Sequence, residues 1–448
     1  MPLARILPSR ETETGCRLDR PSRHSPIRRC RVRSRHILGL CALSLLLAVA
    51  ACGGPAWGSA PLTGSGQVAP ITPPSQPRPP VAPTGQSTPT ADFHPRVEVV
   101  ASHLEIPWAL AFATRLPGSD PQASSGPLIF VTERPGRIRL VIDGRLRPEP
   151  VAVLPVAAEG EGGLMGLDLD LHFDRNGYLY VMYTRRGSAG LRNRISRLTL
   201  HGMLAGEEKV LLDDIPAGTL HDGGRLKLGP DGKLYATTGE NTLGLPAQSL
   251  ASLAGKILRL NPDGTVPADN PFPGSPVYSY GHRNPQGLAW QPGTGQLFSA
   301  EHGPSKGIDA DRCCHDEINR IVPGANYGWP AVAGAAGDPR FVDPVYESGD
   351  DTWAPSGLAF YDADVLAAWK GSLFFGALRG LHLHRLVLGG PGNDRVVGEE
   401  RLFEGAFGRI RDVAVGSDGA LYFTTSNRDY RWPAGPDDDR ILRVVPGQ

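Results

Sequence analysis

The sequence predicts an all-β protein, a six-bladed β-propeller built from four-stranded antiparallel blades. From about residue 92 onward, one pattern recurs six times: a short apolar strand, a turn, an aromatic-rich strand, and a strand with Arg or Lys between apolar residues. Equivalent positions in successive copies lie 55 to 70 residues apart, a period typical of propeller blades. No long helical periodicity competes with this pattern.

Each copy is visible in its first two strands. In chain order the copies are WALAFA with LIFVTE, LDLDLHFDRNGYLYVMYT, GRLKLGPDGKLYATTGE, QGLAWQPGTGQLFSAEHG, SGLAFY with GSLFFGAL, and RDVAVGSDGALYFTTS. The equivalent positions are Phe112, Leu171, Leu228, Trp290, Phe360 and Val415. Asn-Gly and Asp-Gly pairs, which favour tight hairpin turns, join the strands of three copies.

The two ends of the repeat region complement each other. The last copy has no outer strand after Val445, whereas the segment Arg96 to Val100 precedes the first copy without a partner of its own. We expect this segment to join the sixth blade and close the ring, which hides sheet edges. Ligands of such rings usually bind at the mouth of the central channel.

We expect the propeller to span residues 92–448. The residues that precede it have the features of an export signal. The apolar run from Ile37 to Ala51 is shorter than the ~20 residues that a membrane span needs, and it follows a basic segment. Residues 1–51 therefore predict a signal peptide. The run ends in Val-Ala-Ala-Cys52, which resembles a bacterial lipobox with Cys52 as the lipidated residue; ordinary cleavage nearby is the alternative.

Residues 52–91 are rich in Pro, Gly, Ser and Thr and predict an extended tether. We therefore expect an exported protein, periplasmic or on the cell surface, that is attached to the membrane only through a lipid. The first 51 residues carry a formal charge of +7 and the whole chain is neutral, so the remainder carries −7. A mildly acidic domain argues against nucleic-acid binding.

Polar residues gather where inner strands are expected to start. They are Glu161, His221, Arg283 with Asn284, and Arg409 with Arg411. Arg409 and Arg411 stand two apart, so both side chains point to one face of a strand. Several Arg side chains around one axis favour a ligand with several anionic groups, and a His at a channel mouth can act as a general base. Ordinary polar loops are the alternative.

Seven motifs occur in a characteristic order. They are Gly163-Leu164, His221 with Gly223 to Leu226, Gly281 to Gly287 (GHRNPQG), Glu301 to Pro304 (EHGP), Asp316 to Asn319 (DEIN), Asn326 to Pro330 (NYGWP) and Arg409 to Asp412 (RIRD). In this order the sequence resembles the soluble, pyrroloquinoline quinone (PQQ)-dependent aldose sugar and glucose dehydrogenases, over about residues 96–446.

The resemblance implies an enzyme that binds PQQ at the channel mouth and oxidises an aldose at C1 to the lactone. It implies that His221 is the general base for the C1 hydroxyl, and that Arg283 lies at the quinone carbonyl, where negative charge develops. The cofactor contacts that it implies are Glu161, Asn284, Arg379, Arg409 and Arg411. It leaves the preferred sugar, the electron acceptor and the oligomeric state open.

The resemblance also implies Ca²⁺. The backbone carbonyls of Gly303 and Pro304 match ligands of a calcium ion that also binds PQQ and polarises it as a Lewis acid. Glu317 and the carbonyl of Tyr327 match a second, structural calcium site.

Two departures from the family pattern stand out. Glu161 occupies a position where the family commonly has Gln; if ionised, it would repel an anionic cofactor and raise the pKa of His221, and if protonated it would imitate Gln. An insert of eleven residues, Ser305 to His315, separates two of the motifs.

That insert contains Cys313 and Cys314, which have three possible states. Export favours a disulfide, although the Cα atoms of adjacent residues are only about 3.8 Å apart, so such a bond would be strained and easily reduced. Free thiols, or metal ligation together with His315, are the alternatives. Because the domain has no other cysteines, the sequence does not indicate a disulfide framework.

Two other functions remain as alternatives to the dehydrogenase. One is a catalytically silent propeller that binds a partner or a glycan, since the fold does not guarantee chemistry. The other is a calcium-dependent sugar lactonase, which would not need the Arg409 and Arg411 pair or the His-Arg-Asn run.

Overall fold

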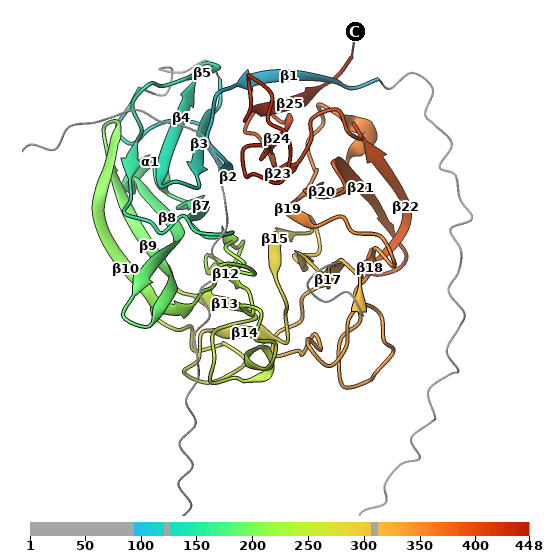
Figure 1. Cartoon of the computed structure of the whole chain (residues 1–448). Helices are drawn as coiled ribbons and strands as arrows, with labels where there is room; N and C mark the ends of the chain where they lie inside the picture. The colour runs from blue at the N-terminus through green and yellow to red at the C-terminus, as the bar shows by residue number, and fades with distance from the viewer. Residues whose placement is uncertain (1–93, 121–125, 306–311, 448) are drawn as a thin grey trace, which may run out of the picture. The chain divides into compact units, whose positions relative to one another are not determined.

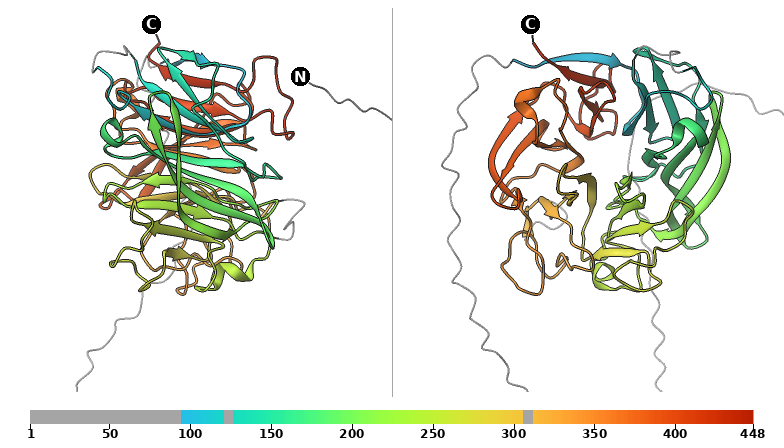
Figure 2. Two further views of the ribbon diagram at one scale, coloured as in Figure 1. Left: turned by 90° about the vertical axis from the view of Figure 1, so that its left-hand side faces the viewer. Right: turned by 180° about the vertical axis from the view of Figure 1, so that it is seen from behind.

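The computed structural model of the chain describes residues 94–120, 126–305 and 312–447. Six antiparallel sheets in this part stand around a common axis as the blades of a propeller, as the sequence predicts (Figure 1). Figure 2 shows the same ring edge-on and from behind. The predicted signal peptide, Cys52 and the tether of residues 52–91 lie outside the described residues. Within the described residues, no helix is both long and apolar enough to cross a membrane.

The first three blades run from the inner strand outward in chain order. Blade 1 contains β2 (Pro107–Ala113), β3 (Leu128–Glu133), β4 (Arg137–Ile142) and β5 (Arg145–Leu146), with β6 (Ala152–Val153) also paired to β4. Blade 2 contains β7 (Leu164–Leu169), β8 (Tyr178–Gly187), β9 (Gly190–His201) and β10 (Leu204–Pro216). Blade 3 contains β11 (Leu226–Leu228), β12 (Leu234–Thr238), β13 (Lys256–Leu260) and β14 (Val277–Tyr280).

The last three blades follow the same plan. Blade 4 contains β15 (Pro285–Trp290), β16 (Leu297–Glu301), β17 (Glu317–Arg320) and β18 (Tyr346–Glu347). Blade 5 contains β19 (Pro355–Phe360), β20 (Leu373–Ala377), β21 (His382–Gly389) and β22 (Arg395–Leu402). Blade 6 contains β23 (Ile410–Val415), β24 (Leu421–Thr425), β25 (Ile441–Val445) and β1 (Arg96–Ala101). The helical segments are short: α1 (Phe173–Asn176), η1 (Leu245–Gln248) and η3 (Ala367–Trp369).

The N-terminal strand closes the ring. β1 pairs antiparallel with β25, with Arg96 opposite Val445, and becomes the outer strand of blade 6 (Figure 1). A cross-strand ion pair, Arg443 Nε to Glu98 Oε2 at 2.7 Å, supports the pairing. The predicted closure is therefore confirmed.

The equivalent positions of the repeat lie in the first strand of five blades, but in blade 2 the position lies outside that strand. The second strand of blades 1, 3, 4, 5 and 6 is buried along its whole length, because other blades cover both of its faces. In blade 2, however, β7 ends at Leu169, so the equivalent position Leu171 lies in the following turn and is 63% exposed. The repeat in this blade is displaced because its turn contains α1.

A buried ion pair joins the blades near the axis. Arg225 Nη1 lies 2.9 Å from Asp412 Oδ1, and Arg225 Nε donates to the carbonyl of Gln286 at 2.8 Å. The guanidinium also lies 4.4 Å from the ring centroid of Trp108. Asp412 Oδ2 accepts the N–H of Leu110 at 2.7 Å. Blades 1, 3, 4 and 6 therefore meet at one buried charge pair.

We predict that Asp412→Ala lowers the free energy of unfolding by about 3–5 kcal/mol, because it leaves the buried Arg225 cation without its counter-charge. Urea unfolding followed by tryptophan fluorescence measures the change. The matched control is Asp364→Ala, which removes an exposed partner of Lys370 and is expected to leave the unfolding midpoint nearly unchanged. Equal, small effects in both variants would contradict a central role for the axial pair.

Candidate active site

A cavity of about 220 Å³ lies at the end of the ring where the inner strands start. Its lining residues are Glu161, Leu220, His221, Arg283, Gln286, His302, Ser305, Thr352, Ala354, Leu378, Arg379, Arg409, Arg411 and Arg431. Six of the seven predicted catalytic and cofactor-binding residues line it together. The seventh, Asn284, does not.

His221 is held by a carboxylate that the sequence analysis did not identify. Its Nδ1 lies 2.6 Å from Glu240 Oε1, and both side chains are buried. Burial alone would raise the pKa of Glu240, but hydrogen bonds from His221 and from the N–H of Gly244 lower it, so Glu240 is ionised. An ionised Glu240 accepts a hydrogen bond from Nδ1–H, which leaves the lone pair of the neutral His221 ring on Nε2. That is the arrangement a general base needs.

The repeat itself contains the signal that could have revealed Glu240. In the next blade, His282 Nδ1 lies 2.8 Å from Glu301 Oε2, and the two pairs have the same spacing of 19 residues. His282 is fully buried and its Nε2 contacts Ser279 Oγ at 2.8 Å, so this second pair is structural.

Two arginines at the start of β23 line the cavity, and one of them is paired with a carboxylate. Arg409 is paired with Asp429, with Nη2 to Oδ2 at 2.8 Å. Arg411 Nη1 donates to Gln286 Oε1 at 2.5 Å, but its buried Nε has no hydrogen-bond partner among the described residues. Burial and the charge of Arg409 lower the pKa of Arg411 to about 9. An anionic group in the cavity would relieve both conditions.

Glu161 is ionised and its charge is balanced. Its Oε1 lies 3.0 Å from Arg431 Nη1, and its Oε2 accepts the backbone N–H of His221 at 3.0 Å. Burial would raise the pKa of Glu161, but the charge of Arg431 and the hydrogen bond from the His221 N–H lower it to about 2. Of the two alternatives for Glu161, the structure favours the carboxylate, with Arg431 offsetting its repulsion of an anion.

Arg431 was not predicted from the sequence. It lies in the loop between β24 and β25, 270 positions from Glu161, and no repeat pattern connects the two. Gln286 and His302 were also given no role, although both stand within the motifs GHRNPQG and EHGP.

The remaining predicted residues occupy different places. Arg283 Nη1 donates to the carbonyl of His302 at 3.3 Å, and its guanidinium lies 5.2 Å from the ring centroid of Trp329. Asn284 is fully buried: its Oδ1 accepts the N–H of Gly223 at 2.9 Å, and its Nδ2 lies 3.4 Å from His302 Nδ1. Asn284 therefore stands behind His302, outside the cavity lining. Arg379 lines the cavity from the exposed turn after β20.

His302 is neutral in this setting. Burial lowers its pKa to about 3, with further lowering by Arg411 and Arg283. Its buried Nε2 has no hydrogen-bond partner among the described residues. A neutral imidazole of this kind is available to a bound ligand.

The four predicted metal-binding residues surround a second, smaller void. Gly303, Pro304, Glu317 and Tyr327 line a space of about 10 Å³, close to the size of one water or ion. Arg283 and His302 line both spaces, so the small void adjoins the larger cavity.

Gly303 is fixed so that a side chain is impossible there. Its N–H donates to Asp316 Oδ1 at 2.9 Å, and a Cβ would lie 2.1 Å from the carbonyl oxygen of His315. The backbone of Gly303 is therefore close-packed beside the void, and its carbonyl is the group that it can offer to a cation.

The carboxylates around the void fit a cation. Burial, and then the neighbouring Glu301 carboxylate, raise the pKa of Glu317. A cation would relieve this repulsion. Within the described residues, no group of three or more His, Cys, Asp or Glu side chains is arranged to hold a metal. A cation here would thus depend on backbone carbonyls as well, which suits a hard ion.

The cysteine pair is next to Gly303, since the Cys314 carbonyl packs against that glycine. Cys313 and Cys314 are joined by a disulfide, the first of the three states considered, and residues 306–311 of the insert lie outside the described residues. Among the described residues, the His315 side chain contacts Glu347, with Nδ1 to Oε2 at 2.9 Å.

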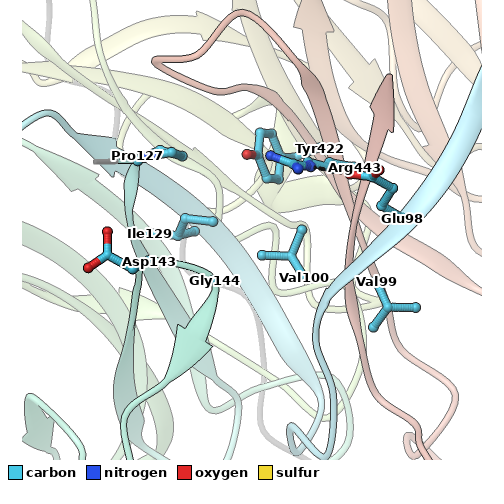
Figure 3. A pocket seen from close by; sticks show the side chains of 10 residues that line it. Glu98, Val99, Val100, Pro127, Ile129, Asp143, Gly144, Tyr422 and Arg443 are labelled. Atoms are coloured by element: carbon cyan, nitrogen blue, oxygen red, sulfur yellow. Dashed lines mark hydrogen bonds and ion pairs between the residues drawn. The ribbon is translucent and has the colours of Figure 1, made fainter. Parts of the chain in front are cut away.

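A further hollow, of about 290 Å³, lies at the seam between blades 6 and 1 (Figure 3). Two of its charged groups are paired: Arg443 of β25 reaches toward Glu98 of β1, and Arg443 Nη1 also lies 3.5 Å from Asp418. Because these charges are already paired, we place the candidate active site in the cavity at the strand starts.

The fold and this cavity define a class of protein. The sequence matches the family described as Glucose / Sorbosone dehydrogenase over residues 104–432, and the chain belongs to that family.

Individual relatives are consistent with this assignment. The chain is 33% identical over 352 residues to an aldose sugar dehydrogenase of Escherichia coli, a match that covers 73% of this chain and 89% of the relative. A solved structure from Thermus thermophilus, provisionally described as an oxidoreductase (glucose dehydrogenase), is 48% identical; the match covers 79% of this chain and 100% of that one, with a TM-score of 0.70. The PQQ-bound aldose sugar dehydrogenase of Streptomyces coelicolor is 37% identical; the match covers 79% and 99%, with a TM-score of 0.66.

Proposed function

We propose that this protein oxidises the C1 hydroxyl of an aldose to the lactone with bound PQQ, and that calcium supports the cofactor. Membership of the family and the PQQ-bound relative support a PQQ-dependent sugar dehydrogenase. The observation that carries the proposal is the placement of Arg411, with its unpartnered Nε, in the same cavity as the His221–Glu240 pair. One group binds an anion, and the other accepts a proton.

The cavity residues fit PQQ, a planar quinone with three carboxylates. Arg411, Arg409 and Arg379 are positioned to bind carboxylates, and a carboxylate at Arg411 would satisfy its buried Nε. Asn284 stays a predicted contact, although its position behind His302 favours an indirect role. Glu161 acts at a distance through Arg431 and His221.

Each catalytic side chain has one task. Bound PQQ supplies the two-electron acceptor for the hydride that leaves C1. His221 Nε2 accepts the proton of the C1 hydroxyl, and the ionised Glu240 stabilises the imidazolium that results. Arg283 provides positive charge at the border of the two spaces, where negative charge develops during the reaction.

A calcium ion beside Arg283 would be held by the carbonyls of Gly303 and Pro304 and would act as a Lewis acid. Glu317 and the carbonyl of Tyr327 are proposed to hold a structural calcium ion. The two alternative functions are weaker, because neither a lactonase nor a silent propeller requires paired arginines beside a histidine base.

We predict that His221→Ala lowers turnover of the PQQ-reconstituted enzyme by about 10²-fold or more, while PQQ affinity changes little, because the base is lost and the carboxylate-binding arginines are kept. Dye reduction with an aldose measures turnover, and PQQ titration measures affinity. His201→Ala, which changes an exposed histidine, is the control. Turnover within a few-fold of wild type would remove His221 from the mechanism.

We predict that Arg411→Ala weakens PQQ binding by about 1.5–3 kcal/mol, the contribution of one hydrogen bond to a charged group. Arg411→Lys should recover only part of this loss, since Lys lacks the planar fork of Arg. Calorimetric titration of each apoprotein with PQQ measures the effect, with the exposed Arg340→Ala as control. Equal PQQ affinities for Arg411→Ala and wild type would contradict the assignment of Arg411 to the cofactor site.

We predict that calcium raises the Tm of the EDTA-treated apoprotein, because an ion bound only by the native state stabilises it. Mg²⁺ should raise it less, since it prefers a smaller octahedral site. Glu317→Gln should reduce the calcium shift, whereas the surface variant Glu105→Gln should keep it. A Tm that does not respond to calcium would argue against both proposed ions.

A further inference from the structure

The insert that precedes Asp316 contains a disulfide between adjacent cysteines. Cys313 and Cys314 are bonded to each other, with a sequence separation of one residue. The insert departs from the family pattern, so membership of the family gives this pair no role. A disulfide stabilises a fold mainly by closing a loop of chain, and a bond between neighbours closes almost none. Stabilisation alone therefore does not account for the pair.

The two cysteines differ in their access to solvent. Cys313 is half-buried, whereas Cys314 is fully buried. A thiolate from solvent can therefore attack the sulfur of Cys313, with the sulfur of Cys314 as the leaving group. Adjacent residues do not reach the Cα separation of an ordinary disulfide, which makes such a bond easier to reduce. The pair thus combines an accessible sulfur with a reducible bond.

The buried cysteine packs against the small void proposed for calcium. A Cβ built on Gly303 would lie 2.2 Å from the carbonyl oxygen of Cys314 and 2.1 Å from that of His315. Gly303 also donates its N–H to Asp316 Oδ1 at 2.9 Å. The backbone of Gly303, which lines the void, therefore lies directly on the residues that form and follow the disulfide.

The other cysteine contacts the start of blade 5. Thr352 lines the larger cavity, and its Oγ1 lies 3.9 Å from Cys313 Sγ. Asp316 Oδ2 accepts the N–H groups of Trp353 at 2.6 Å and Ala354 at 2.8 Å. The short segment that contains the disulfide is therefore packed between the void and the cavity lining.

Reduction of the disulfide changes the packing at this point. Two thiol sulfur atoms do not stay at bonding distance, so they move apart to van der Waals contact. A close-packed interior has little free space for such a shift, and Cys314 is fully buried. The displacement therefore reaches the backbone that packs on Gly303. Because calcium needs its oxygen ligands at ~2.3–2.6 Å, a displaced carbonyl binds it less tightly.

We propose that the Cys313–Cys314 disulfide is a reversible redox modification site, reduced by a dithiol, and that its reduction weakens calcium binding at the neighbouring void. The inference rests on the proposed function, in which calcium supports the cofactor. It adds a control on that support, since the oxidised protein holds the ion and the reduced protein releases it more readily.

The exchange of bonds is balanced. One thiolate of the dithiol bonds to Cys313 Sγ while the bond between the cysteines breaks, and Cys314 Sγ leaves with the electron pair and takes a proton. The second thiolate of the donor then displaces Cys313 Sγ, which also takes a proton. The donor ends as a disulfide, and the protein has gained two electrons and two protons.

The test measures the calcium affinity of the EDTA-treated, full-length protein by calorimetry, before and after treatment with dithiothreitol. Mass spectrometry after thiol alkylation reports the state of the pair. Reduction should weaken calcium binding about 10- to 100-fold, the range for loss of a contact that orients a metal ligand. Reoxidation should restore the original affinity.

The matched control is the double variant Cys313→Ser with Cys314→Ser, which should bind calcium weakly with or without dithiothreitol. It keeps the four cysteines that precede residue 53, so any effect of the reductant through them, or on calcium itself, appears in this variant as well. The comparison of oxidised with reduced wild type uses the unchanged chain and does not depend on the folding of the variant.

The inference and the proposed function fail separately. Equal calcium affinities of oxidised and reduced wild type would overturn the inference, as would a disulfide that dithiothreitol reduces only in the unfolded protein; the proposed calcium site would survive both results. An equal effect of dithiothreitol on the double variant would also overturn it. If the oxidised protein binds no calcium, the inference fails together with the proposed calcium site, whereas sugar oxidation with PQQ is measured independently by dye reduction.

Discussion

Arg225 and Asp412 form a buried ion pair near the axis of the ring, and the positions of the cavity residues depend on it. The pair is surrounded by groups from four blades, so separating it would expose a charge that the interior cannot solvate. Asp412 directly follows Arg411, and Gln286 contacts Arg225 through its backbone and Arg411 through its side chain. The contacts that hold the blades together therefore also position Gln286 and Arg411 in the cavity lining.

A hydrogen bond between a histidine and a glutamate occurs in two blades and has a different role in each. A histidine before the inner strand bonds to a glutamate 19 residues later in both blade 3 and blade 4. In blade 4 both ring nitrogens are engaged inside the protein, so the pair fastens two strands. In blade 3 the equivalent histidine lines the cavity, so one nitrogen faces a ligand. The same His–Glu contact therefore stabilises the packing of blade 4 and orients a candidate general base in blade 3.

Charge balance explains why so many arginines share a small space. Asp429 offsets Arg409, and Arg431 offsets Glu161, so the two pairs contribute structure and little net field. Among the described residues, the side-chain hydrogen-bond partner of Arg411 is the neutral Gln286 amide, and burial together with the charge of Arg409 lowers the pKa of Arg411. The cavity therefore favours an anionic ligand group near Arg411, while the His221–Glu240 pair lies elsewhere in the lining.

The sequence by itself determined the architecture: six repeats, the closing strand from Arg96 onward, and the group of polar residues at the strand starts. It could do so because strand alternation, turns and repeat spacing are local properties of the chain. Only the tertiary structure decided which side chains meet. The pairing of Glu161 with Arg431 spans 270 positions and depends on ring closure, which places blades 2 and 6 on either side of blade 1, whereas the position of Asn284 behind His302 depends on local packing. No periodicity encodes such contacts, because they arise from the closure of the ring and from the packing of individual side chains.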